Sequence, residues 1–134
     1  METIFEDEFV TFEIDTEKSL YIFSWKPTTE NITAEDLIEY GKKSVATIQK
    51  FQIKNIIGNS THFRYLIVPG VQQQLNDNVF SKLNHGTVKK FAHVVNHEMI
   101  TQMSIEQTYD ENIHKTYNDK FFESLQDAIN WCLE

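Results

Sequence analysis

The chain has 134 residues, the length of one domain, and its 40% hydrophobic and 24% charged residues are ordinary for a soluble globular protein. Its 20 acidic and 12 basic residues give a formal net charge of −8. Nucleic acids and anionic membranes need clustered basic residues, and the two lysine pairs, Lys42-Lys43 and Lys89-Lys90, are isolated, so we expect neither partner. No apolar run approaches the ~20 residues of a membrane-spanning helix.

The N-terminal segment and the cysteine usage indicate a cytoplasmic protein. Residues 1–8 carry four acidic residues and no basic one, whereas a secretory signal begins with basic residues. Cys132 is the one cysteine, so it has no partner for an internal disulfide. We expect a single domain over residues 1–134, with residues 1–7 disordered ahead of the first strand.

The first half of the chain predicts a strand hairpin, a helix and a buried strand. Two stretches joined by a polar turn alternate apolar and other side chains, as half-buried strands do: Phe9–Ile14 and Leu20–Trp25. The second stretch is apolar on both faces, so we expect it to be the more central strand. Thr33 and Asp36 form a capping-box pattern that starts a helix, whose apolar spacing runs to about Lys50. The short apolar segment Asn55–Ile57 predicts a buried strand.

The second half predicts three more helices with strands between them. The expected helices are Pro69–Leu83, Glu98–Glu111 and a closing helix capped by Ser124, and the expected strands are Phe91–Val95 and the weaker Thr116–Phe122. In the helix from Glu98 we expect Met99 and Met103 to face the core. Repeated strand–helix–strand units need parallel pairing with right-handed crossovers. The sequence therefore predicts an α/β fold, a mixed β-sheet with an antiparallel N-terminal hairpin and then parallel strands, covered by about four helices.

Four segments of the chain carry a family likeness: the hairpin end Tyr21–Trp25, the Pro-led helix start Ile67–Gln74, the strand Lys89–Val95 and the closing helix Phe122–Leu133. In order and spacing they resemble the anti-sigma-factor-antagonist (STAS) family, in particular its SpoIIAA-like bacterial branch. The resemblance extends over nearly the whole chain. It implies the mixed α/β sheet described above and a non-enzymatic regulatory role.

The resemblance also implies a switch and a ligand. In STAS regulators, a serine in the loop after the third strand is phosphorylated by a partner kinase. The corresponding residue here is Ser60, although Asn59 precedes it where the regulators have an Asp-Ser-type context. The SpoIIAA-like branch is also likened to lipid-carrying CRAL-TRIO domains, which implies a small apolar ligand.

Two polar loops follow predicted parallel strands, and ligands of open α/β sheets bind at that edge. The candidate binding residues are Asn59, Ser60, Thr61 and His62 after one strand, Asn96, His97 and Glu98 after the next, and Arg64, the single arginine of the chain. The planar fork of Arg64 suits carboxylate or phosphate groups. The alternatives are that the Asn, Ser and Thr residues act only in turns and caps, and that the stem of Arg64 covers apolar surface.

The sequence contains no strong catalytic or metal-binding motif. Its five histidines include no His-x-x-x-His pair on a predicted helix, so we expect no metal site. It lacks a Gly-x-Ser-x-Gly elbow and the glycine-rich phosphate loops, so we expect no catalytic residues and no cofactor. An enzyme that uses Ser60, His97 and Glu98 as nucleophile, base and orienting group stays open as an alternative.

These observations favour a non-enzymatic cytoplasmic regulatory or protein-interaction domain that is switched at the loop after the third strand. The main alternative is a carrier of a small apolar, lipid-like ligand, with Arg64 or His62 meeting the polar end of that ligand. The shape of the molecule distinguishes the hypotheses. An enclosed apolar cavity favours the carrier, a polar cleft at the loop edge favours the enzyme, and a flat or convex edge favours the interaction domain.

Overall fold

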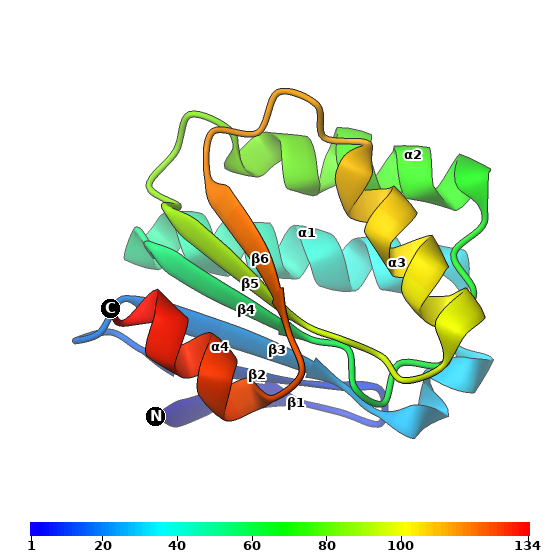
Figure 1. The fold of residues 1–134 in the computed structure, drawn as a ribbon, viewed down its shortest axis with the longest axis horizontal. Helices are drawn as coiled ribbons and strands as arrows, with labels where there is room; N and C mark the ends of the chain where they lie inside the picture. Colours follow the sequence, from blue (N-terminus) through cyan, green and yellow to red (C-terminus); the bar gives the residue numbers. More distant parts are fainter.

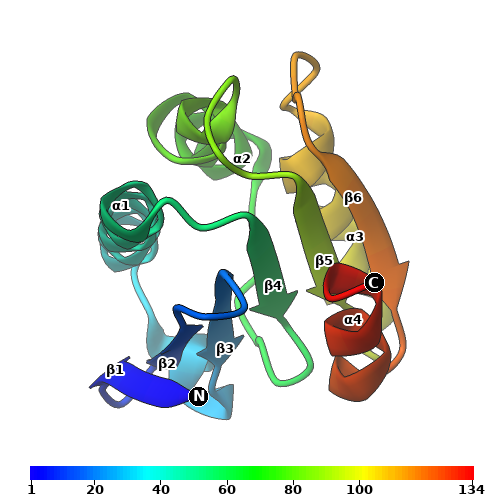
Figure 2. The same cartoon turned by 90° about the vertical axis from the view of Figure 1, so that its left-hand side faces the viewer.

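The computed structural model describes all residues, 1–134, and contains one six-stranded sheet in which spatial order follows sequence order (Figures 1 and 2). The strands are β1 (Glu2–Glu6), β2 (Val10–Asp15), β3 (Leu20–Trp25), β4 (Asn55–Asn59), β5 (Lys90–Val94) and β6 (Asn118–Phe122). Strands β1, β2 and β3 pair antiparallel, and β3 to β6 pair parallel. The predicted α/β class, the mixed sheet and the central place of Leu20–Trp25 are confirmed.

The helices are α1 (Ala34–Phe51), α2 (Pro69–Asn78), α3 (Met99–Asp110) and α4 (Leu125–Cys132), with short 3-10 helices η1 (Pro27–Asn31) and η2 (Phe80–Leu83). Helices α1, α2 and α3 cover one face of the sheet, and α4 covers the other (Figure 2). Strand alternation supplies both layers: in β5, Phe91 belongs to the larger core of 21 residues, and Ala92 and Val94 to the smaller core of seven with α4. No helix is long and apolar enough to cross a bilayer.

The predicted helix starts at Thr33 and Ser124 are confirmed, although neither Asp36 nor Asp127 reaches back to complete a capping box. The hydroxyl of Thr33 accepts a hydrogen bond from the backbone N–H of Asp36 at 3.0 Å, and that of Ser124 accepts one from Asp127 at 3.2 Å. Each bond satisfies an amide that the first helical turn leaves free. Cys132 is buried on the sheet side of α4, and burial raises the pKa of its thiol to about 11.

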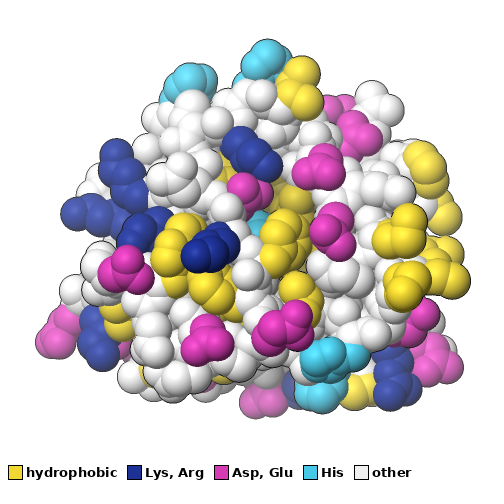
Figure 3. Space-filling model, viewed as in Figure 1, with side chains coloured by type: hydrophobic (Ala, Val, Ile, Leu, Met, Phe, Trp, Pro, Cys, Tyr) yellow, Lys and Arg dark blue, Asp and Glu magenta, His cyan; other side chains and the backbone are white.

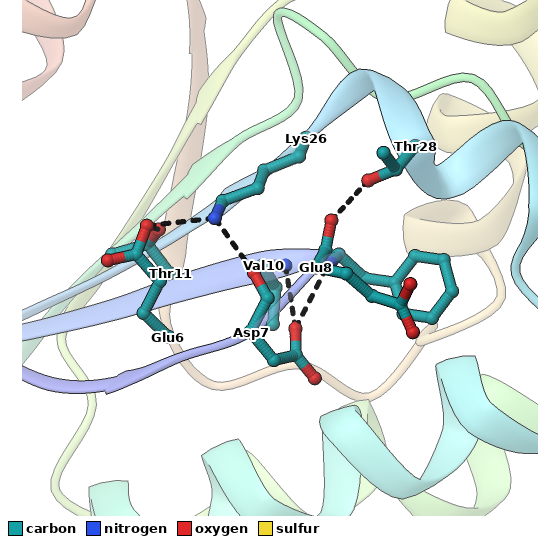
Figure 4. Close-up of polar contacts among 8 residues, drawn as sticks. Glu6, Asp7, Glu8, Val10, Thr11, Lys26 and Thr28 are labelled. Carbon is teal, nitrogen blue, oxygen red and sulfur yellow. Dashed lines mark hydrogen bonds and ion pairs between the residues drawn. The ribbon is translucent and has the colours of Figure 1, made fainter.

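Residues 1–7 are ordered, which corrects the expected disorder. Glu2–Glu6 pairs with β2 as the edge strand β1, because the Phe5 ring packs 5.3 Å from that of Phe12. The turn that follows is also fixed (Figure 4): the Lys26 ammonium donates to Glu6 at 2.8 Å and to the carbonyl of Asp7 at 2.7 Å. The Asp7 carboxylate accepts from two backbone amides of the turn, and Tyr40 of α1 donates to it. The acidic residues Glu2 and Glu6 of this strand are exposed.

Two helix predictions are wrong in detail. The helix from Pro69 ends at Asn78, because Val79 leaves helical geometry with φ −127°, and η2 follows as a separate turn. In α3, Met99 and Met103 are exposed rather than inward. The buried face of α3 instead comprises Ser104, Ile105, Thr108 and Tyr109. The hydroxyls of Ser104 and Thr108 donate to backbone carbonyls within the helix at 2.8 and 2.7 Å, so these residues can be buried without unpaired hydroxyl donors.

Candidate functional site

The carboxyl ends of the parallel strands lie at one edge of the sheet, which we call the loop edge (Figure 1, lower right). It comprises η1 after β3, the segment 60–68 after β4 and the segment 95–98 after β5. The backbone N–H of Arg64 donates to the buried hydroxyl of Thr29 in η1 at 2.8 Å, which ties the first two of these segments together.

Asn96 fixes the relative position of the other two segments. Its buried side-chain amide donates to the carbonyl oxygens of Ser60 and Phe63 at 2.8 and 2.7 Å. Its side-chain oxygen accepts from the backbone N–H of Glu98 at 2.9 Å, and its own backbone N–H donates to Gln102 of α3 at 2.8 Å. One asparagine therefore orders the loops after β4 and β5 together with the start of α3.

Local hydrogen bonds also engage three of the other predicted site residues. The side-chain oxygen of Asn59 accepts from the backbone N–H and the hydroxyl of Thr61 at 3.3 and 2.7 Å. The Glu98 carboxylate caps α3 by accepting both the backbone N–H and the hydroxyl of Thr101 at 2.7 Å, and these bonds hold the pKa of Glu98 below its ordinary value. Turn and cap chemistry thus accounts for Asn59, Thr61 and Glu98 without a ligand.

An open polar hollow of about 520 Å³ lies between the segments of the loop edge. Its lining includes six of the eight predicted binding residues, Thr61, His62, Arg64, Asn96, His97 and Glu98. Sequence reasoning missed Glu30 of η1 and Thr101 of α3, which also line it. Glu30 lies in a polar connection before a helix, and no sequence pattern there predicts that it lies near Arg64. The two residues meet only because the chain folds.

Three basic side chains of the hollow stay available for a partner. His62 and His97 are exposed, and no hydrogen bond engages their rings. The guanidinium of Arg64 lies 3.9 Å from the Glu30 carboxylate, and both side chains are more than 60% exposed, so this ion pair is weak. The hollow therefore offers one guanidinium and two imidazoles to a partner, beside the carboxylates of Glu30 and Glu98.

Ser60 lies on the other side of its loop. It is only 5% exposed, and it lines an apolar cavity rather than the hollow. Its backbone N–H donates to Val94 at 3.2 Å, which continues the pairing of β4 with β5 past Asn59. In this conformation a kinase cannot reach the Ser60 hydroxyl.

The apolar cavity lies between the sheet and helices α1, α2 and α3. Its volume is about 60 Å³, and 15 of its 19 lining residues are hydrophobic. Pockets for drug-sized ligands measure roughly 300–1,000 Å³. The cavity as it stands therefore has no room for a lipid chain.

The structure separates the three residues of the enzyme hypothesis. Ser60 faces the apolar cavity, whereas His97 and Glu98 line the polar hollow. No hydrogen bond joins the three side chains, and Glu98 is engaged as a helix cap. A nucleophile and its base must lie within ~3 Å of each other, so this arrangement does not form a catalytic triad.

Comparisons of the chain with protein-family models, with curated proteins and with solved structures give no match in any of the three.

Proposed function

We propose that the chain is a non-enzymatic, STAS-like regulatory domain of the cytoplasm that binds a partner protein through the loop edge. The observation that carries the proposal is the combination of ordered backbone and free basic side chains in the hollow. Asn96 holds the loops in place, and His62, Arg64 and His97 lie around the open space between them. A rigid edge with unengaged side chains loses little conformational entropy when it binds.

Arg64 indicates what the partner offers. The hollow contains this single arginine of the chain and two of its five histidines, beside the carboxylates of Glu30 and Glu98. A guanidinium binds a carboxylate through two parallel hydrogen bonds. The partner is therefore expected to place an acidic side chain over Arg64, where it would displace Glu30 from its weak pair.

The loop after β4 is the proposed place of regulation. Ser60 is buried and its carbonyl is held by Asn96, so phosphorylation requires that this loop first opens. A phosphate would add up to about two negative charges to Ser60, which could not return to an apolar cavity without a large desolvation cost. Phosphorylation would thus keep the loop open and disassemble the loop edge.

Affinity capture tests the proposal. We expect proteins captured by the wild-type chain to be lost, at least tenfold, from the double variant Arg64→Ala/His97→Ala. A matched double variant with exposed basic residues elsewhere, Lys18→Ala/His114→Ala, should capture them as the wild type does. If no captured protein distinguishes the two double variants, the loop edge is not a partner site. Comparing Ser60→Asp with Ser60→Ala in the same assay tests the switch, because equal capture by the two would exclude it.

A carrier of a small apolar ligand is the second candidate, and the apolar cavity is the observation that favours it. Its volume of about 60 Å³ means that α1 and α2 would have to separate from the sheet to admit a lipid. Native mass spectrometry after incubation with a lipid extract tests this function. An unliganded mass alone would reject the carrier.

A further inference from the structure

Five large apolar side chains are exposed beside the loop edge, and we call them the apolar patch. They are Leu66 and Val68, which are 50% and 49% exposed, and Met99, Ile100 and Met103 of α3, which are 75%, 61% and 52% exposed. In Figure 3, yellow side chains gather on the right-hand side, where Figure 1 places the start of α3 and the segment that leads into α2. Exposed apolar clusters with polar margins are typical of interaction sites.

The amphipathicity of α3 is partly inverted, and folding of the chain alone does not explain it. The helix buries the hydroxyl residues Ser104 and Thr108, while Met99, Ile100 and Met103 face solvent. A helix selected only for packing on its sheet would place the methionines inward and the hydroxyls outward. The solvent face of α3 is therefore suited to a second apolar surface.

The two parts of the apolar patch form one fixed surface. The backbone N–H of Ile67, between Leu66 and Val68, donates to the hydroxyl of Ser104 at 3.3 Å. The buried side chain of Gln72 donates to the carbonyls of Ile67 and Ser104 at 2.8 and 3.5 Å, and to Gln107 at 3.1 Å. Segment 66–68 is thus bound to α3, which fixes the position of Leu66 and Val68 relative to the helix that carries the other three residues.

We propose that the apolar patch docks a protein segment that presents large apolar side chains with a carboxylate beside them. This inference rests on the proposed function and names the chemistry of its partner. Arg64 is two residues from Leu66 and His97 is two residues from Met99, and both border the patch on the side of the hollow, together with the carboxylates of Glu30 and Glu98. Residues 55–81 and 91–114 contain no lysine, which leaves Arg64 as the one permanent cation of these segments. The carboxylate of the partner therefore lies over Arg64.

Charge also argues against other occupants. An anionic lipid surface attracts clusters of lysine and arginine, and the patch has a single arginine at its margin. Two copies of the chain would each bring a net charge of −8, which opposes their association. Glu98 beside Met99 and Glu106 three residues after Met103 add negative groups at the margin, so Arg64 is the one position there at which a carboxylate of the partner meets a permanent positive charge.

Site-specific photo-crosslinking in the native cells tests the proposal. The photoreactive residue p-benzoylphenylalanine is placed at Ile100 in the patch, at His62 in the hollow, or at Ile113, which is 80% exposed and lies beyond the other end of α3. We expect the probe at Ile100 to attach to a partner protein, and the probe at Ile113 to give no such adduct. The peptide attached at Ile100 should contain large apolar residues and an Asp or Glu. The added substitution Arg64→Glu should lower the yield at least tenfold, and Lys18→Glu, a matched charge reversal elsewhere, should leave it unchanged.

The outcomes separate the inference from the proposed function. A protein adduct at His62 without one at Ile100 overturns the docking surface and keeps the loop edge as a partner site, whereas adducts at neither position overturn both. Adducts at Ile100 with lipid only, or with a second copy of the chain only, overturn the inference. It is also overturned if the attached peptide lacks an acidic residue, or if the yield is insensitive to Arg64→Glu.

Discussion

The Nε2 atom of His93 on β5 lies 3.7 Å from Oδ2 of Asp119 on β6. This distance is too long for a hydrogen bond, and both ring nitrogens of His93 are buried without a partner among the aromatic rings of Phe91, Tyr109 and Phe121. Burial therefore lowers the pKa of His93 below its ordinary value of 6.5. The facing His93 ring and the ammonium of Lys115, 2.9 Å away, lower the pKa of Asp119 to about 2.

We expect His93 to make the folded chain less stable as the pH is lowered from 7.5 to 5, because the unfolded chain takes up the His93 proton at a higher pH than the folded chain. Asp119 does not contribute in this window, since its stabilising charge is lost only as the pH falls from about 4 towards 2. His93→Phe keeps a ring in place and removes the unpaired nitrogens. Its free energy of unfolding in urea at pH 5 should exceed the wild-type value by about 1 kcal/mol or more.

His114→Phe is the control for this experiment, because His114 is exposed. It should retain the wild-type dependence on pH. If the wild type instead gains stability relative to His93→Phe at pH 5, protonated His93 pairs with Asp119, and burial does not dominate.

Replacing Asn96 should loosen the loop edge. Asn96→Ala leaves the buried carbonyls of Ser60 and Phe63 without their donor, so we expect a loss of about 1–3 kcal/mol in the free energy of unfolding. Hydrogen exchange of the amides in segments 60–64 and 96–98 should accelerate in parallel. Asn78→Ala removes one exposed side-chain bond to Gln74 and should cost no more than about 0.5 kcal/mol. Equal losses for the two variants would mean that Asn96 does not order the loops.

Two glycines should respond oppositely to alanine. A Cβ at Gly41 of α1 would lie 2.6 Å from the Val79 side chain, whereas one at Gly70 of α2 would meet nothing within 4 Å. Gly41→Ala should therefore lose about 1–2 kcal/mol, although alanine favours the helix, and Gly70→Ala should gain up to about 1 kcal/mol. The double variant Gly41→Ala/Val79→Ala should show favourable coupling of at least about 0.5 kcal/mol. Additive effects in thermal or urea unfolding would show that Gly41 and Val79 do not approach so closely.

Substitutions in α3 test which face of the helix is buried. Met99→Lys and Met103→Lys should change the free energy of unfolding by no more than about 0.5 kcal/mol, because both side chains face solvent. Ile105→Ala, on the buried face, should cost about 2–5 kcal/mol. A large loss in the free energy of unfolding for either methionine variant, measured by urea unfolding, would mean that the methionine is buried in the core.

The sequence predicts those parts of the fold whose signals are local. Strand alternation gives β2 and β3, and the side chains of Thr33 and Ser124 give two helix starts that the structure confirms. The loop edge follows from the same reasoning, since loops after adjacent parallel strands must meet. Six of the eight candidate residues accordingly line one hollow.

The parts that sequence reasoning missed depend on contacts between distant residues. Strand β1 is acidic, and Phe5 orders it by packing on Phe12 and Tyr40 rather than through any periodic pattern. The buried face of α3 contains two hydroxyl side chains that donate to backbone carbonyls. A hydrophobicity scale ranks these residues as polar, so it predicts that they face solvent. Glu30 enters the hollow because η1 meets segment 60–68, a contact that no local pattern indicates.

The hydrogen bonds from Asn96 to the carbonyls of Ser60 and Phe63 fix the loops independently of the side chains that these loops expose to solvent. Because backbone atoms and one interior amide set the course of the loops, the solvent-facing positions 62, 64 and 97 contribute little to it. If the proposed partner site is correct, replacing those three side chains would change the partner without changing the course of the loops. Mutational libraries confined to these positions should for the same reason yield mostly folded proteins.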